Sequence, residues 1–99
     1  MRTMLRAVFP VEQSNIAVKN GSLAKTFEGT IARLKPGATY FSAHDGKRSA
    51  TFIFDLHDPS DIPSIVEPLF LELNASVELV PVMNLEELRT GLEKASKNR

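Results

Sequence analysis

The chain has 99 residues, of which 42% are hydrophobic and 24% charged, as in an ordinary globular domain and unlike a disordered segment. It contains no cysteine, which excludes disulfides, thiolate metal sites and thiol catalysis and fits a reducing compartment. Twelve basic and twelve acidic residues cancel, so no excess positive charge attracts nucleic acid or anionic lipid. No run approaches the roughly 20 apolar residues of a membrane span. We therefore expect a single cytoplasmic domain over residues 1–99 that binds neither nucleic acid nor membrane.

The first third of the chain predicts a strand followed by two helical segments. Residues 3–9 are compact and apolar and end at a proline, which favours a strand. Residues 14–19 favour a short helical turn that ends at Asn20-Gly21, a pair suited to left-handed backbone geometry. Ser22 is a candidate N-cap for a longer helix, whose apolar residues follow at helical spacing until the chain reaches residues 35–37 (Lys-Pro-Gly).

The middle of the chain predicts a β-hairpin. Residues 38–44 form its first strand, and residues 48–57, which alternate between apolar and polar side chains, form its second strand. Between them, residues 45–47 (Asp-Gly-Lys) provide the turn, because Asp-Gly favours the primed turns that join antiparallel strands.

A second amphipathic helix is expected after the hairpin. Asp58 is a candidate N-cap and Pro59 a suitable first helical residue. Apolar residues then recur at helical spacing up to Asn74, which ends the helix. Pro68 falls in its interior, where proline removes a hydrogen-bond donor, so we expect a kink or a split there.

The last quarter of the chain predicts a strand and a final helix. Residues 75–83 alternate as a strand, and Pro81 within it favours an edge position because proline cannot donate to the ladder. Asn84 is expected to cap a helix over residues 85–96, which has acidic residues in its first turn, basic residues near its end and a leucine stripe.

This order of elements predicts an α+β fold, in which helices lie on one face of a four-stranded antiparallel sheet. The expected topology is ferredoxin-like (βαββαβ) with an additional C-terminal helix. With right-handed crossovers, we expect the first and third strands at the centre, parallel to each other, and the second and fourth strands at the edges.

The two faces of the predicted sheet differ in composition. One face is nearly all apolar and should pack against the helices; it contains Leu5, Ala7, Phe9, Phe41, Ala43, Ala50, Phe52, Phe54, Val77 and Leu79. The other face mixes apolar and charged side chains; it contains Met4, Arg6, Val8, Tyr40, Ser42, Thr51, Ile53, Asp55, Glu78, Val80 and Val82. A mixed face is typical of two sheets that meet across a dimer, or of a sheet that lines a polar cavity.

With these elements the chain resembles the dimeric α+β barrel superfamily, whose ferredoxin-like subunits associate through their exposed sheet faces. The stretches Asp45–Phe70 and Val77–Asn84 also look like small bacterial proteins without an assigned function. The superfamily includes monooxygenases without cofactor, haem enzymes, isomerases and ligand-sensing domains. The resemblance therefore implies a homodimer and a small-molecule cavity, but no particular reaction.

Four residues of the mixed face are candidate ligand-binding residues. Arg6, Asp55 and Glu78 are predicted on adjacent strands, with Tyr40 near them. An arginine with two carboxylates is suited to bind an anionic or hydroxylated ligand, and a shielded carboxylate can serve as a general base. The alternative is a structural ion pair at a dimer interface, or cross-strand pairing on a wet surface. No catalytic residue is identified.

The sequence predicts no metal site and no cofactor. His44 and His57 fall at opposite ends of the predicted hairpin, so they should not share a metal. Neither can be matched to the axial haem ligand of the barrels that bind haem. The chain also lacks a nucleophile elbow and a glycine-rich phosphate loop.

Three hypotheses about function remain open at this point. The first is a homodimeric domain that binds a small organic ligand. The second is a cofactor-free enzyme, monooxygenase- or isomerase-like, that uses Asp55, Glu78 or Tyr40 as acid or base and Arg6 to bind an anion. The third is a module that pairs through the edge of its fourth strand.

Overall fold

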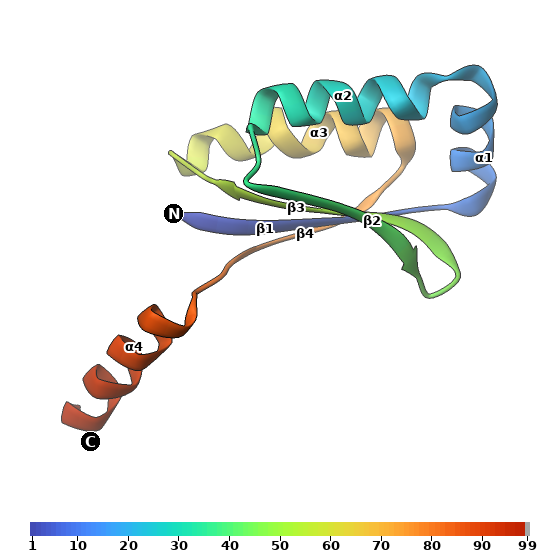
Figure 1. Ribbon diagram of the computed structural model, residues 1–99. Coiled ribbons are helices and arrows are strands. Elements are labelled where there is room, and N and C mark those ends of the chain that lie inside the picture. The colour runs from blue at the N-terminus through green and yellow to red at the C-terminus, as the bar shows by residue number, and fades with distance from the viewer. Residues whose placement is uncertain (99) are drawn as a thin grey trace.

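One antiparallel sheet organises the chain, and the computed structural model describes residues 1–98 of it. The sheet order is β2-β3-β1-β4 (Figure 1). The strands are β1 (Arg2–Phe9), β2 (Ala38–His44), β3 (Lys47–Asp55) and β4 (Ser76–Pro81). The first and third strands lie at the centre and the second and fourth at the edges, as predicted from the sequence.

The prediction that the two central strands are parallel was wrong, because β1 and β3 pair antiparallel, with Leu5 opposite Phe52. A helical crossover returns the chain to its starting end, so β2 runs in the same direction as β1. The tight hairpin then reverses the direction, which leaves β3 antiparallel to β1.

The helices are α1 (Val11–Asn20), α2 (Ser22–Leu34), α3 (Ile62–Leu73) and α4 (Leu85–Lys97), with a short 3-10 turn, η1 (Pro59–Asp61), before α3. Helices α2 and α3 lie side by side over one face of the sheet, and α1 stands at its end (Figure 1). The fold is therefore α+β, with helices over one sheet face. No helix within residues 1–98 is long and apolar enough to cross a membrane.

Helix α1 is longer than the predicted turn, because it begins directly after Pro10. Arg48 of β3 anchors it by donating hydrogen bonds to the Ser14 hydroxyl at 2.7 Å and to Asn15 Oδ1 at 2.9 Å. The helix ends at Gly21, whose φ of 82° is the left-handed geometry expected there. Gly21 also takes the N-cap position of α2 that the sequence predicted for Ser22.

The predicted chemistry is confirmed at the hairpin turn, whereas Asp58 caps η1 and not α3, whose N-cap is Asp61. Asp45 and Gly46 have φ of 51° and 75°, the two positive values of a type I′ hairpin turn. Asp58 caps η1, since its Oδ1 accepts hydrogen bonds from the Ser60 hydroxyl at 2.6 Å and the Ser60 backbone N–H at 2.8 Å. These two hydrogen bonds hold the pKa of the Asp58 carboxyl below its ordinary value.

Helix α3 runs through Pro68 as one continuous helix, so the split that the sequence offered as one of two outcomes, beside a kink, does not occur. The backbone remains helical up to Leu73, and Asn74 ends it in left-handed geometry with φ of 50°. The buried side chains on this helix are Ile65, Val66, Leu69 and Leu73. The packing of these side chains on the sheet offsets the hydrogen bond that is lost at Pro68. Tertiary packing therefore outweighs the local tendency of proline to interrupt a helix.

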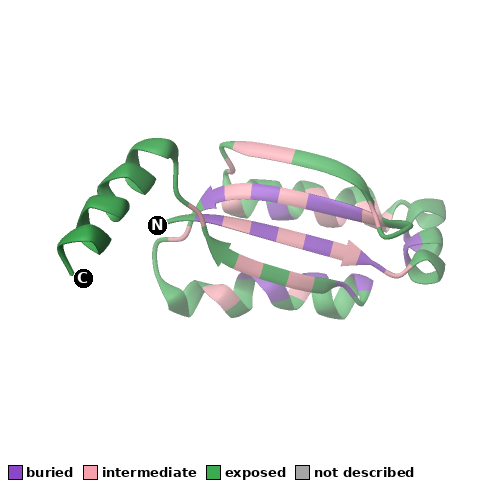
Figure 2. Ribbon diagram, turned by 90° about the horizontal axis from the view of Figure 1, so that it is seen from below, coloured by how far each residue is buried: buried purple, intermediate pink, exposed green. Residues whose placement is uncertain are grey.

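The core lies between the sheet and the helices α2 and α3. Along β1 and β3 the helix-facing residues are buried and alternate with half-buried residues on the other face (Figure 2). The buried hydrophobic residues are Leu5, Ala7, Phe9, Ala17, Ala50, Phe52, Phe54, Ile65, Val66, Leu69, Leu73 and Ala75. The predicted core face is therefore confirmed on the two central strands. On the edge strand β2, Phe41 and Ala43 are exposed.

Helix α4 projects from the body of the molecule on the side of the sheet that carries no other helix (Figure 1). Every residue from Met83 to Asn98 is exposed. The Cα radius of gyration is 16.0 Å, whereas a compact domain of this length has about 13 Å. Asn84 caps the helix in a capping box with Glu87, as the sequence predicted for the cap residue.

Acidic pH is expected to loosen the first turn of α4. The backbone N–H of Asn84 donates to Glu87 Oε1 at 2.8 Å, and Arg2 pairs with the same carboxylate. These contacts hold the pKa of Glu87 below its ordinary value. The stabilisation is therefore present above the ordinary carboxyl pKa and is lost as the pH falls through the lowered value. Carbon chemical shifts of α4, followed by NMR against pH, should report this loss.

Two single variants isolate the carboxylate responsible. Glu87→Gln removes the titrating group but keeps an acceptor oxygen, so the first turn should no longer respond to acid. Glu86→Gln changes a neighbour that accepts none of the capping-box hydrogen bonds, and this variant should respond as the unchanged chain does. An acid response that survives in Glu87→Gln would contradict the assignment.

Candidate functional site

Three of the four candidate residues lie in one row across the open sheet face, which we define as the face opposite α2 and α3. Strand pairing places Tyr40 beside Thr51, Thr51 beside Arg6, and Arg6 beside Glu78. We call these four residues the polar row. Adjacent strands are about 4.8 Å apart, so the polar row spans roughly 14 Å between its outer Cα atoms. The sequence had indicated that these strands were adjacent, and the register brings the side chains into line.

Apolar residues lie on both sides of the polar row. On the side nearer the start of β1, the adjacent row contains Met4 between Ile53 and Val80. On the side nearer the end of β1, the adjacent row contains Val8. Met4, Val8 and Ile53 are half-buried, and Val80 is 38% exposed. No helix covers these residues within the described chain, as Figure 2 shows from this side of the sheet. On the neighbouring strands Val8 is flanked by Ser49 and Ser76. The open face therefore presents a polar strip with an apolar row on the Met4 side and a serine-rich row on the Val8 side.

Arg6 and Glu78 carry opposite charges at directly paired positions. Directly opposed Cβ atoms lie about 4.5–5.5 Å apart, within reach of both side chains. Among residues 1–98, neither side chain takes part in an ion pair within 4.0 Å. The guanidinium and the carboxylate are thus free to contact a ligand. Arginine provides a planar fork of donors for an acidic group, and the carboxylate accepts a hydrogen bond from a hydroxyl.

Asp55 lies apart from the polar row, although it is on the same face. It is four residues along β3 from Thr51, which corresponds to about 13 Å. Its carboxylate accepts a hydrogen bond from the Met1 amine at 2.5 Å and pairs with His57 Nδ1 at 3.3 Å. The hydrogen bond from the amine holds the pKa of Asp55 below its ordinary value. The structure therefore brings together Arg6, Tyr40 and Glu78, and leaves Asp55 with other partners.

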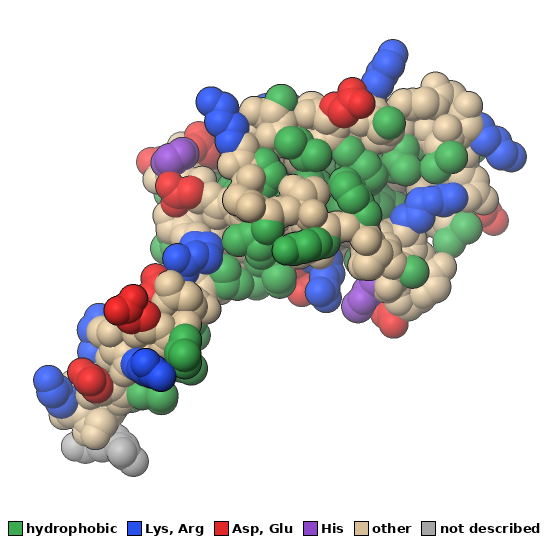
Figure 3. Space-filling model, viewed as in Figure 1, with side chains coloured by type: hydrophobic (Ala, Val, Ile, Leu, Met, Phe, Trp, Pro, Cys, Tyr) green, Lys and Arg blue, Asp and Glu red, His purple; other side chains and the backbone are tan. Residues whose placement is uncertain are grey.

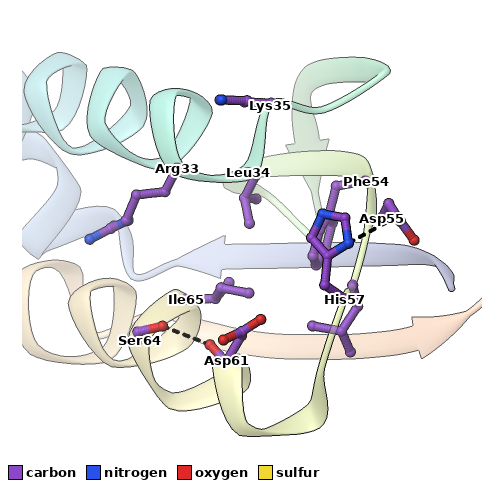
Figure 4. Close-up of a pocket in the computed structure, with 10 residues that line it drawn as sticks. Arg33, Leu34, Lys35, Phe54, Asp55, His57, Asp61, Ser64 and Ile65 are labelled. Atoms are coloured by element: carbon purple, nitrogen blue, oxygen red, sulfur yellow. Dashed lines mark hydrogen bonds and ion pairs between the residues drawn. The ribbon is translucent and has the colours of Figure 1, made fainter.

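A separate hollow of about 500 Å³ lies between the C-terminal end of α2 and the start of α3 (Figure 4). Leu34, Phe54, Leu56 and Ile65 provide its apolar surface. Its polar surface comes from Arg33, Lys35, Asp55, His57, Asp61 and Ser64. In Figure 4, the His57 ring leans toward Asp55, and the Ser64 hydroxyl donates to the Asp61 carbonyl at 2.8 Å.

Sequence reasoning missed this hollow. Of its charged residues around α2, the sequence predicted only that Lys35 lies at the end of a helix. The sequence signal for this hollow is a charged helix end together with a separate charged loop. Only the packing of α2 beside α3 brings these two segments together in space. The charges around the hollow have both signs, and Asp55 and His57 already pair with each other. The polar row, by contrast, has its charges unpaired.

The two histidines lie at opposite ends of the β2–β3 hairpin, as predicted. His44 is near Asp45 at 3.5 Å beside the turn, and His57 follows the other end of β3. Within the described residues, no three side chains of His, Asp or Glu gather as a group that could hold a metal.

The chain was compared with protein-family models, with curated proteins and with solved structures, and none of them matches it.

Proposed function

We propose that the chain is a homodimeric, small-ligand-binding protein, in which a second copy covers the open sheet face and encloses the polar row. The observation that carries this proposal is the register that aligns Arg6, Tyr40 and Glu78 on a face without a helix cover. An alternation of apolar and unpaired polar groups suits a surface that is closed by a partner and still holds a polar ligand.

We also infer a ferredoxin-like subunit of the kind found in dimeric α+β barrels. The central position of β1 and β3 supports this topology. The first connection, however, holds two helices, α1 and α2, where the simple βαββαβ pattern has one. Helix α4 is a further addition after the last strand. The topology is therefore proposed with an enlarged first crossover and a C-terminal extension.

The ligand class follows from the chemistry of the polar row. The Arg6 guanidinium suits a carboxylate, Glu78 suits a hydroxyl donor, and Met4 and Ile53 suit an apolar or aromatic body. We therefore propose a small organic acid that also carries a hydroxyl group. This proposal concerns binding only, and we assign no reaction to the polar row.

Light scattering of the purified protein tests the homodimer. We expect the mass of a dimer, and Val80→Glu should shift it toward the monomer, because the substitution places a charge in the covered face. Ile31→Glu is a matched control, since Ile31 has the same 38% exposure but lies on α2, away from the open face. A monomer in the unchanged chain, or equal effects of the two substitutions, would overturn the homodimer.

The ligand class is tested by NMR titration with 4-hydroxybenzoate, a probe that carries the proposed acid, hydroxyl and ring. Shifts at Arg6, Tyr40 and Glu78 are expected, and Arg6→Gln should weaken binding by about tenfold or more, the loss typical for a charged hydrogen-bond partner. Arg33→Gln removes the same charge from the hollow between α2 and α3. If Arg33→Gln abolished binding while Arg6→Gln did not, the polar row would be the wrong site.

A further inference from the structure

Helix α4 has an apolar stripe that is exposed along its whole length. Leu85, Leu88 and Leu92 recur at helical spacing and are 61%, 40% and 60% exposed. Hydrophobic side chains gather along one flank of this projecting helix (Figure 3). Apolar surface of this extent, on a helix that otherwise carries charged residues, is typical of an interaction site.

The start of α4 is tied to the first residue of β1. The Val82 N–H donates to the Arg2 carbonyl at 3.1 Å, which extends the pairing of β4 with β1 as far as the linker. Arg2 then pairs with Glu87, and the capping box orders the first turn. Only Val82, Met83 and Asn84 separate β4 from α4. The linker is short and has contacts at both ends, and in this structure the leucine stripe is exposed and does not lie on its own open face.

The open sheet face is the matching unfilled surface on the same chain. It lacks a helix layer, and α4 projects on that side of the sheet (Figure 1). Leu85 to Leu92 spans about 10 Å along the helix axis, and Met4 to Val8 spans about 13 Å along β1. The leucine stripe and the stretch of the open face from Met4 to Val8 are therefore similar in length.

Charges beside the two surfaces are complementary. On α4, Arg89 and Glu93 are four residues apart and flank the leucine stripe on the same side. On the open face, Arg6 and Glu78 are neighbours within the polar row. Without a ligand, a helix laid on this face can set Arg89 against Glu78 and Glu93 against Arg6, and a ligand bound in the polar row replaces these two contacts. The formal net charge of zero adds no general repulsion between two copies.

From these observations we infer that the two copies exchange their C-terminal helices, so that α4 of each copy lies on the open sheet face of the other. This inference rests on the homodimer proposed above and names the element that covers the face. It differs from direct sheet-to-sheet contact, which would leave both leucine stripes exposed. An exchange of this kind is isologous, because each copy gives and receives the same surfaces.

Disulfide cross-linking tests the exchange, since the chain has no cysteine of its own. A Leu88→Cys variant is mixed with an Ile53→Cys variant and oxidised, with Leu71→Cys on the far side of α3 replacing Ile53→Cys as the control. We expect a mixed dimer only from the first pair. Predominant Leu88→Cys self-dimers would indicate helix-to-helix contact, and predominant Ile53→Cys self-dimers direct sheet contact; either would overturn the exchange.

A second measurement separates failure of the exchange from failure of the homodimer. Replacing Leu88 and Leu92 together with serine should weaken dimerisation by more than about a hundredfold in sedimentation equilibrium, from the loss of two buried leucines. The fold should remain, because both side chains lie outside the core. A monomeric unchanged chain would contradict the homodimer itself. A dimer that survives the double substitution would contradict only the exchange.

Discussion

Replacing Leu69 with alanine should lower the free energy of unfolding by about 2–5 kcal/mol, the range for large-to-small substitutions in a packed core. Leu69 is 0% exposed, and it lies on the face of α3 that packs against the sheet. The substitution removes buried methyl groups and leaves a cavity that a helix fixed on a sheet cannot fully close. Urea denaturation followed by circular dichroism measures the change.

Leu71 provides the matched control for this experiment. It lies two residues further along the same helix and is 77% exposed. The same chemical change, Leu71→Ala, should therefore alter the free energy of unfolding by no more than about 0.5 kcal/mol. Both variants are measured at one protein concentration, so that any dimerisation affects them equally. Similar losses in the free energy of unfolding at the two positions would show that Leu69 is not part of the packed core.

The second large effect is expected from Pro68→Ala, which should raise the stability of the chain by about 2 kcal/mol. Proline in a helix interior costs about 3 kcal/mol, because it lacks the N–H that would bond to residue 64 and its ring crowds that carbonyl. Without the proline the unfolded chain becomes more flexible, and this reduces the gain in stability by up to about 1 kcal/mol. Denaturation midpoints of the two proteins in urea test this expectation.

Pro63 lies in the first turn of the same helix and should respond in the opposite direction. The N–H of a residue in the first turn has no partner within the helix, so Pro63→Ala restores no hydrogen bond. It only frees the unfolded chain, and a loss of about 0.4–1 kcal/mol is expected. If both substitutions changed stability with the same sign, the cost attributed to the interior proline would be wrong.

Local chemistry was sufficient to predict most of the elements of the fold. The strand over residues 38–44 has the predicted bounds, and the type I′ turn follows from Asp45-Gly46. Asn84 caps α4 as expected. The continuous helix through Pro68 was not predictable in this way, because the packing that keeps it helical comes from strands distant in sequence.

The candidate site could also be predicted only in part from the sequence. Alternation along each strand was enough to place Arg6, Tyr40, Asp55 and Glu78 on the same face, but alternation does not give the register between strands. Only the register aligns three of them and places Asp55 four residue pairs away from Arg6 along the ladder. The leucine stripe of α4 likewise indicated an apolar contact without indicating where its partner surface lies. Contacts between distant parts of a chain have no signature in a short window of sequence.

The position of β1 in the sheet has a consequence for synthesis. Leu5 pairs with Phe52 on one side and with Leu79 on the other, so both neighbours of β1 follow it by long stretches of chain. On the ribosome, β1 emerges before either neighbour exists, whereas the β2–β3 hairpin can form as soon as its turn is made. The sheet is completed only when β4 has emerged. An apolar strand therefore remains without its hydrogen-bonding partners until β3 and β4 have been made, and it is exposed to aggregation for that period.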